Sequence, residues 1–332
     1  LSTHGSDNAG CLPFPADSLV PPEGYDEQEM FIHYAYGIAN GFDQLPRVAY
    51  YMMGDLETPG APGNEWRYAD DWPVPAANVP FYFHRDHTLR LTAPTAASHS
   101  LTYTYNPLDP VPTLGGANLT VDRGNYDQQS IESRADVLLF QTDPLTAPLE
   151  LTGRITANIY ASSDRIDTDF TAKLTDVYPD GKSVILCDGI LRARYRDGFG
   201  QQTVMNPGTV YLFQVDLTSV AVTFNTGHRI RVALSSSNSP RFAANPNNGE
   251  VILIGANCLV AHNTIRFNAT YPSNIILPIT GPDADSDATP DLVDAFPDNP
   301  NEWSDADDDG LGDNFEQTII DADPTDAIDS LA

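Results

Sequence analysis

The sequence predicts a mostly β protein, folded as an antiparallel β-sandwich whose strands we expect to follow jelly-roll order. Between residues 48 and 279, apolar and polar residues alternate in many short stretches, which is the pattern of half-buried strands. Gly, Pro and Asn separate these stretches, and no long helical segment lies between them. Short strands joined by turns favour antiparallel layers over a parallel α/β sheet.

The clearest strand is predicted over residues 149–159, where apolar side chains occupy almost every second position. A second covers residues 170–174, and the sequence Pro179-Asp180-Gly181 that follows it favours a tight turn. Residues 210–217 and 230–234 alternate in the same way. We predict strands over both.

The region before residue 48 is rich in loops and contains one predicted helix, over residues 27–39. Gly41 follows as a stop signal. The apolar residues at helical spacing are Met30, Phe31, Tyr34 and Ile38. We therefore expect three parts: residues 1–47, a sandwich over residues 48–280, and a tail over residues 281–332.

The net charge of the chain is −29, from 46 acidic and 17 basic residues. Residues 281–332 hold 17 of the acids and no Lys or Arg. Such a chain repels phosphate backbones, so we expect no nucleic-acid partner. No apolar run is long enough to span a membrane. The chain begins at Leu1 without a leader, so we expect a processed chain or a fragment.

Two acidic segments of the tail have the spacing of calcium loops. The better one has acids at positions 1, 3, 5, 9 and 12 with Gly310 at position 6, where a sharp turn is needed. Calcium prefers six to eight oxygen ligands, and the carbonyl at position 7 adds one. The predicted ligands are Asp305, Asp307, Asp309, Leu311 through its carbonyl, Asp313 and Glu316.

The other segment fills the same positions with Ala288 in place of Gly and with Asp at position 12. Its predicted ligands are Asp283, Asp285, Asp287, Asp291 and Asp294. The prolines between the loops exclude a full EF-hand, and the pattern resembles thrombospondin type 3 repeats, in which calcium substitutes for a core. The alternative is a disordered acidic tail. Since millimolar calcium outside cells would fill such loops, we expect a secreted or cell-surface protein.

Longer phrases in the β region are more specific than a strand pattern. They include Glu65-Trp66-Arg67, Asp167-Thr168-Asp169-Phe170, Asp188-Gly189 and Gly227-His228-Arg229. Together they resemble the C-terminal half of the cocaine esterase and X-prolyl dipeptidyl-peptidase family of serine hydrolases. The resemblance implies a galactose-binding-like jelly roll that packs on an α/β-hydrolase domain and helps to wall its acyl pocket. It also implies that residues 1–47 are a remnant of that hydrolase domain.

In that family the serine and the aspartate of the triad precede the stretch represented here. His4 stands where the family has its triad histidine, so the resemblance implies a general base toward a serine outside this chain. The alternative is a loop histidine without a role. No G-x-S-x-G elbow occurs, and residues 235–237 are serines at the end of a predicted strand. We expect the chain alone to be inactive.

Other residues have two interpretations. Arginines that share a strand face could bind an anion or could pair with carboxylates such as Asp167, Asp169 and Asp176, and we expect pairing. His84 and His87 could ligate a metal, and Trp66 and Trp72 could stack a sugar or an acyl group; we expect loop and packing roles. The arginines are Arg192, Arg194 and Arg196 on one predicted strand and Arg229 and Arg231 on another.

These observations leave two main hypotheses. In the first, the chain is the C-terminal part of a secreted hydrolase of esters or amides, and its partner is the catalytic fragment of the same precursor. In the second, it is a structural subunit of a calcium-stabilised extracellular filament or surface assembly, and its partners are its own copies. A calcium-dependent carbohydrate-binding module is a third interpretation, resting on fold analogy alone.

Overall fold

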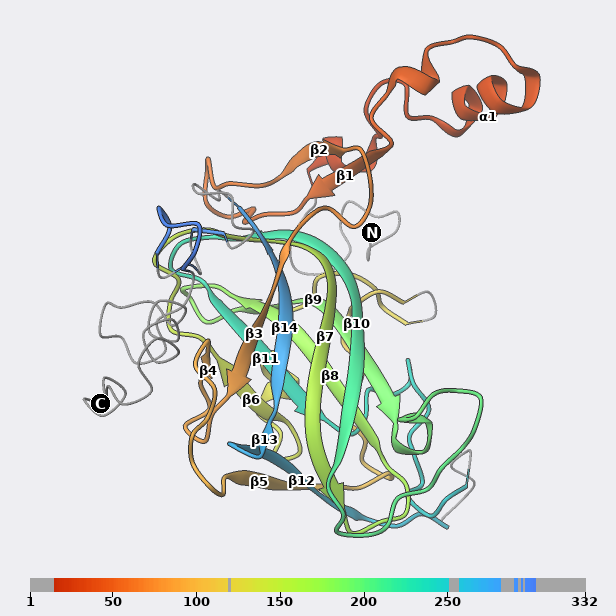
Figure 1. Cartoon of the computed structure of the whole chain (residues 1–332). Helices are drawn as coiled ribbons and strands as arrows, with labels where there is room; N and C mark the ends of the chain where they lie inside the picture. The colour runs from red at the N-terminus through yellow and green to blue at the C-terminus, as the bar shows by residue number, and fades with distance from the viewer. Residues whose placement is uncertain are drawn as a thin grey trace.

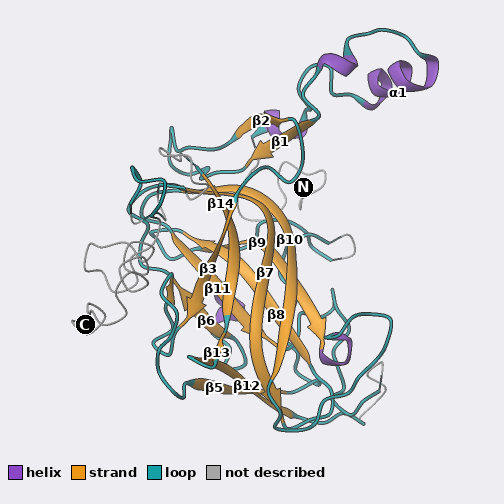
Figure 2. Cartoon of the chain, in the orientation of Figure 1, coloured by secondary structure: helices purple, strands orange, loops and turns teal. Residues whose placement is uncertain are grey.

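Two antiparallel sheets face each other across one hydrophobic core (Figures 1 and 2). The structure is a computed structural model that describes residues 15–118, 121–250, 257–281, 290–291, 294 and 296–302. All ladders between its named strands are antiparallel. The prediction of a mostly β chain is therefore confirmed for the described residues.

The larger sheet has eight strands and is organised around its longest one, β7 (Leu149–Ser163). On one side, β7 pairs with β10 (Tyr211–Phe224) along most of its length. On its other side it pairs with β14 (Asn274–Thr280) and β12 (Ala261–Asn268). The remaining strands extend the sheet outward: β3 (Ala77–Phe83) and β4 (Leu89–Arg90) beyond β14, with β5 (Ser100–Tyr105) and β13 (Tyr271–Pro272) on β12.

The smaller sheet has the strand order β6-β11-β8-β9. Its central strand β8 is buried at every residue, because the segment that contains the short helix α2 (Gln129–Glu132) covers its outer face. The strands are β6 (Leu138–Gln141), β8 (Asp169–Val177), β9 (Ser183–Arg192) and β11 (Arg229–Ser235). A strand covered on both faces explains why the alternation of residues 170–174 continues into buried polar side chains.

The core between the sheets is built from fully buried aromatic and aliphatic side chains. Phe170 of β8 and Phe213 of β10 meet across the interface with ring centroids 4.4 Å apart. Phe140 of β6 lies 4.7 Å from Phe83 of β3, again measured between centroids. These contacts join strands of opposite sheets, so the inward residues of both sheets form one core.

The N-terminal part of the described chain, residues 15–72, lies outside the sandwich, and we call it the arm. It contains α1 (Glu27–Tyr36), the one-turn helices η1 (Ala16–Leu19) and η2 (Phe42–Gln44), and a ribbon of β1 (Val48–Met52) with β2 (Glu65–Ala69). Figure 1 shows α1 at the far end of the arm, pointing away from both sheets. The large sheet therefore begins at β3, after the ribbon.

The predicted helix exists but ends three residues before the expected residue 39. Gly37 adopts the left-handed conformation at φ 68°, and the amides of Gly37 and Ile38 bond back to the carbonyls of His33 and Ile32. Such a pair of hydrogen bonds is typical of a helix that ends at a glycine. The stop signal is thus Gly37 and not Gly41.

The four predicted strands all exist and correspond to β7, β8, β10 and β11, and the turn at residues 179–181 is also present. Cys187 and Cys258 form no disulfide with each other. None of the helices in the described ranges is long and apolar enough to cross a bilayer. The strand order of a jelly roll and the division of the chain into three parts stay predictions.

Candidate functional site

The serines at the end of β11 are held as structural groups. Ser235 shares a hydrogen bond with Thr171 at 2.6 Å, Ser236 with Tyr103 at 2.7 Å, and Ser237 accepts the amide of Val111 at 2.8 Å. All three are buried. Among the described residues they have no histidine partner and follow no sharp strand-to-helix turn, so nothing there activates them as nucleophiles. His4, the predicted triad member, lies outside the described residues.

All five arginines lie within ion-pair distance of a carboxylate, as expected. Arg194 and Asp167 form a buried pair with an N–O distance of 2.7 Å, and Arg192 pairs with Asp169 at 2.9 Å. Arg231 of β11 pairs with Glu132 at 2.6 Å, whereas Arg229 lies 3.7 Å from an exposed carboxylate of Asp143.

Two details of the arginine prediction are wrong. Residues 193–195 form a single helical turn, η3 (Ala193–Tyr195), so the three arginines of residues 192–196 do not line one strand face. Asp176 pairs with His228 instead of with an arginine. Arg196 bonds mainly to backbone carbonyls. Most of these arginines are held in ion pairs, and the open hollow that Arg229 and Arg231 line also contains the carboxylates of Asp86 and Asp143.

The histidine and tryptophan candidates have local partners. His84 lies 3.0 Å from the carbonyl of Thr92, and His87 lies 2.9 Å from that of Leu139. Trp66 donates its indole N–H to the carbonyl of Asp17, and its ring packs edge-on against Tyr51. Trp72 packs edge-on against Tyr50 but remains 39% exposed. These contacts agree with packing and turn roles.

Only two of the predicted calcium ligands lie in the described part of the chain. Asp294 is 8% exposed, and its carboxylate accepts the amide of Phe296 at 2.8 Å. Asp291 is partly buried. The described residues contain no group of three or more His, Cys, Asp or Glu placed to hold a metal. The remaining ligands, Asp283, Asp285, Asp287, Asp305, Asp307, Asp309, Leu311, Asp313 and Glu316, lie outside the described residues, so calcium stays a prediction.

The arm carries an apolar surface that stays largely exposed in the described structure, where the ring of Tyr34 contacts Phe42 and His33 of the arm itself. No residue of α1 is buried. Tyr34 and Tyr36 are each 71% exposed and Phe31 is 57% exposed. We call this the arm's apolar surface, formed by Met30, Phe31, Tyr34, Tyr36 and Ile38. Large apolar side chains gathered at one place on a protein mark an interaction surface.

Several contacts join the arm to the sandwich. The backbone of Met53 bonds to Ala221 and Thr223 of β10 at 3.0 and 2.8 Å. Arg67 of β2 makes a bidentate ion pair with Glu150 of β7, at 2.6 and 2.8 Å. Each of these contacts fixes the ribbon, and not α1, to the large sheet.

A further attachment is buried and charged. Asp55, in the loop between β1 and β2, lies 3.5 Å from His228, whose other ring nitrogen lies 2.8 Å from Asp176 of β8. We call these three residues the carboxylate–histidine cluster.

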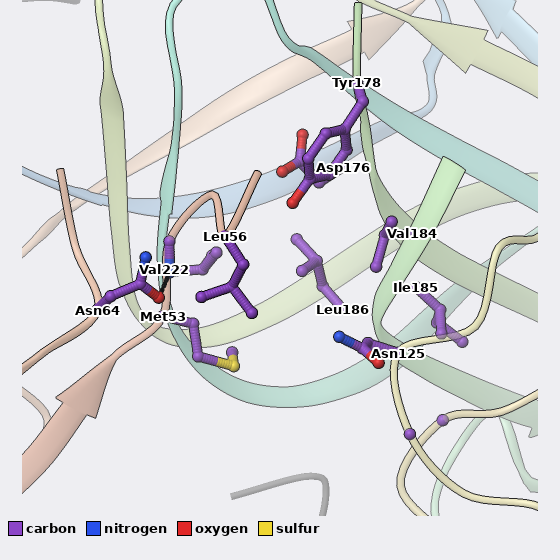
Figure 3. Close-up of a pocket in the computed structure, with 13 residues that line it drawn as sticks. Met53, Leu56, Asn64, Asn125, Asp176, Tyr178, Val184, Ile185, Leu186 and Val222 are labelled. Atoms are coloured by element: carbon purple, nitrogen blue, oxygen red, sulfur yellow. Dashed lines mark hydrogen bonds between the residues drawn. The ribbon is translucent and has the colours of Figure 1, made fainter. Parts of the chain in front are cut away.

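A small pocket lies beside this cluster, between the loop after β1, strand β9 and the loop around residues 116–125 (Figure 3). Its volume is about 40 Å³, little more than one water's share of liquid volume. Met53, Leu56, Val184 and Leu186 line it with apolar side chains, and Asp176 is its one charged wall residue. A pocket of this size has no room for a drug-sized ligand.

The described part of the chain is a β-sandwich with an N-terminal arm. Residues 40–276 match the family described as the X-Pro dipeptidyl-peptidase C-terminal non-catalytic domain. That match covers more than half of the chain, and the chain belongs to this family.

The individual relatives are hydrolases. The chain is 38% identical over 263 residues to cocaine esterase of Rhodococcus sp. (strain MB1 Bresler), covering 75% of the chain and 44% of the relative. It resembles the solved structure of an aminopeptidase from a marine sediment Thaumarchaeota archaeon, with 28% identity and a TM-score of 0.70. That match covers 82% of this chain and 47% of the aminopeptidase. The solved structure of an α-amino acid ester hydrolase shares 26% sequence identity and gives a TM-score of 0.66, and the match covers 77% of this chain and 44% of that one. The chain thus spans less than half the length of these relatives.

Sequence reasoning missed the arm's attachments. Gly227-His228-Arg229 and Asp176 stand out in the sequence, but no pattern there predicts that His228 pairs with Asp176. Asp55 carries no sequence signal of its own, because it is 121 residues from Asp176 and 173 from His228. A histidine beside a turn glycine between two strands was the only available hint.

Proposed function

We propose that this chain is the C-terminal, non-catalytic half of a secreted serine hydrolase, and that the catalytic half packs on the arm's apolar surface. The observation that carries the proposal is α1, a ten-residue helix with no buried side chain. An isolated helix of this length is marginal in water. Packing of its exposed aromatic side chains against another domain would stabilise the helix. The part of the relatives that this chain does not cover could supply that domain.

In the intact enzyme the reaction would be hydrolysis of an ester or amide through an acyl-serine. The serine and aspartate of the triad would come from the catalytic half, and His4 would be the general base. The sandwich, which we propose to be a jelly roll, would wall the acyl pocket and stabilise the assembly. Ser235, Ser236 and Ser237 would take no part, since their hydroxyls are used in buried hydrogen bonds.

Mixing the chain with a separately produced catalytic half tests this proposal. The chain alone is expected to show no turnover of a chromogenic ester, and the mixture is expected to show turnover together with a stable complex. Phe31→Asp places a charge on the arm's apolar surface and should weaken the complex at least about tenfold, because buried aromatic anchors dominate such interfaces.

Phe199→Asp is the matched control, because Phe199 is also an exposed phenylalanine (83%) and lies outside the arm. It should leave binding unchanged. Equal effects of the two variants, or no complex at all, would contradict the docking proposal. Filaments of the chain alone that dissolve in chelator would instead support a structural subunit of an extracellular assembly.

We also propose that the acidic tail binds calcium in two loops related to thrombospondin type 3 repeats. The spacing of Asp305–Glu316 supports this, because six oxygens converge when alternate residues of a tight loop point inward. The buried carboxylate of Asp294, at position 12 of the first loop, shows that this residue sits inside the fold and not in solvent. Loading by extracellular calcium is consistent with secretion.

Calorimetric titration of the full chain with calcium chloride is the test. We expect heat of binding in the wild type, and for Glu316→Gln a loss of affinity of at least about tenfold at one loop, because the bidentate ligand is removed. Asp298→Asn is the control. It removes one negative charge at an exposed residue between the loops, so the calcium affinity of this variant should match that of the wild type. Absence of heat in the wild type would refute calcium binding.

A further inference from the structure

The carboxylate–histidine cluster brings together residues from three distant parts of the chain. His228 Nδ1 donates to Asp176 Oδ1 at 2.8 Å, and His228 Nε2 lies 3.5 Å from Asp55 Oδ2. Relative exposures are 1% for His228, 2% for Asp55 and 4% for Asp176. An imidazole is thus held between two carboxylates in the interior.

Each member of the cluster is fixed by further contacts. Asp55 accepts the amides of Glu57 at 2.8 Å and Thr58 at 3.2 Å, and the side chain of Asn225 at 3.1 Å. His228 occupies the turn between β10 and β11, and its carbonyl accepts the amide of Leu145. The backbone of His228 is therefore anchored separately from the loop that carries Asp55.

The other charged groups around the cluster are few. The ring of Tyr178, from the end of β8, packs on the imidazole with centroids 4.3 Å apart. On that ring lies Lys182, 5.2 Å from its centroid, and Lys182 pairs with Glu57 of the same loop as Asp55. Lys182 also lies 3.8 Å from the exposed carboxylate of Asp180. These three groups pair among themselves outside the cluster, so the charge inside the cluster depends on His228.

With a protonated His228 the three groups carry a net charge of −1, and with a neutral His228 they carry −2. Two buried carboxylates without a cation between them repel each other and are poorly solvated. Of the three groups, Asp55 is the one in a loop, whereas Asp176 lies inside the central strand β8. When His228 loses its proton, the repulsion between the two carboxylates is therefore relieved most easily by displacing the loop that carries Asp55.

The pKa directions agree with this geometry. Desolvation lowers the pKa of His228, but the hydrogen bond and charge of Asp176 and the charge of Asp55 outweigh it, and the net pKa lies above 6.5. Burial raises the pKa of Asp176, which His228 offsets only in part. A raised folded-state pKa contributes stability that is present below the unfolded value and is lost as pH rises through the folded value.

Asp55 acts in the opposite sense at low pH. Burial opposes its ionisation, but hydrogen bonds from Thr58, Glu57 and Asn225 give it a net lowered pKa. The stability that ionised Asp55 contributes to the fold is therefore lost only in strong acid, as the pH falls through that lowered pKa. From mildly acidic pH upward, His228 is the member whose charge changes first.

We propose that the carboxylate–histidine cluster is a pH-dependent latch, which holds the arm on the sandwich while His228 is protonated and loosens it as the pH rises. The latch acts through the loop of Asp55, which directly continues the Met53 segment that bonds to β10. The proposal concerns this chain by itself and does not depend on a catalytic partner.

The test combines NMR titration of the His228 ring with hydrogen exchange of the Glu57 and Thr58 amides in the full chain, from about pH 5.5 to about pH 9.5. We expect the ring to titrate above its ordinary value. Over the same pH range, exchange of these two amides, corrected for intrinsic rates, should accelerate at least tenfold. A ring that titrates below 6.5, or amide protection independent of pH, would overturn the latch.

Variants separate the latch from general stability. His228→Gln should remove the pH dependence of exchange and leave the two amides weakly protected throughout. Should that variant fail to fold, Asp55→Asn keeps a hydrogen-bond acceptor and should lower the midpoint of the ring titration. Asp164→Asn is the control, since Asp164 pairs at 2.9 Å with the exposed His262, and it should leave Glu57 and Thr58 unaffected.

Discussion

At the scale of single residues, the most informative group is Lys173, one of only two lysines in the chain. It points from β8 to the covered face of the small sheet, is 4% exposed, and contacts Gln128 at 3.3 Å. Desolvation lowers its pKa to about 8, although Asp188 and Glu132 act against this change. A buried lysine thus coexists with two acids in a chain of strongly negative charge.

The lowered pKa predicts a pH-dependent stability. Between about pH 8 and 10.5 the unfolded chain holds the Lys173 proton more tightly than the folded chain, so the free energy of unfolding rises with pH. Relative to Lys173→Met, the wild type should gain up to about 3 kcal/mol across this range. Denaturant unfolding at several pH values measures the difference. Lys182→Met, at the other lysine, is the control and should keep the rise with pH, because Lys173 is still present.

At the scale of elements, Gly189 determines how closely the two sheets approach at one edge. A Cβ on Gly189 of β9 would lie 2.0 Å from the carbonyl oxygen of Asp216 in β10. That carbonyl belongs to a β-bulge between Asp216 and Ser219, where Thr218 takes a φ of 72°. Only a residue without a side chain fits beside this bulge.

Gly189→Ala should therefore lower the free energy of unfolding by about 1–3 kcal/mol or more, since backbone on both strands must shift. Thermal or urea unfolding gives the value. Gly200→Ala is the matched control, because nothing lies within 4 Å of the added methyl group there. If both substitutions are equally mild, the close contact between β9 and β10 is not a constraint on the fold.

The elements predicted best from sequence were those with a simple period. Leu149, Leu151 and Ile155 alternate without interruption, and β7 was predicted correctly although it continues to Ser163. The arginine run failed because a chain turn at Ala193 breaks the strand, and alternation over three residues does not reveal a single helical turn. Local pattern thus predicts an element, whereas its end depends on neighbours that are distant in sequence.

At the scale of the whole molecule, the sequence predicts that the interior arginines pair with carboxylates, but it predicts only some of the residues that pair. Asp167 and Asp169 lie close in sequence to the arginines they meet, with one β-hairpin between them. The three residues of the carboxylate–histidine cluster come from three sections of the chain, and only the assembled fold brings them together. The arm's exposed surface was missed because helical spacing indicates an apolar face and not what covers it.

The close approach at Gly189 has a consequence for the behaviour of this chain among its copies. β10 and β9 each end a sheet, and an uncovered edge strand is a template on which strands of another molecule can add. Here Met53 bonds along part of β10, the bulge interrupts the rest, and the amide of Gln128 and the carbonyl of Tyr126 bond to the first residues of β9. Strand addition, the first step toward amyloid-like aggregates, is thereby obstructed along this seam.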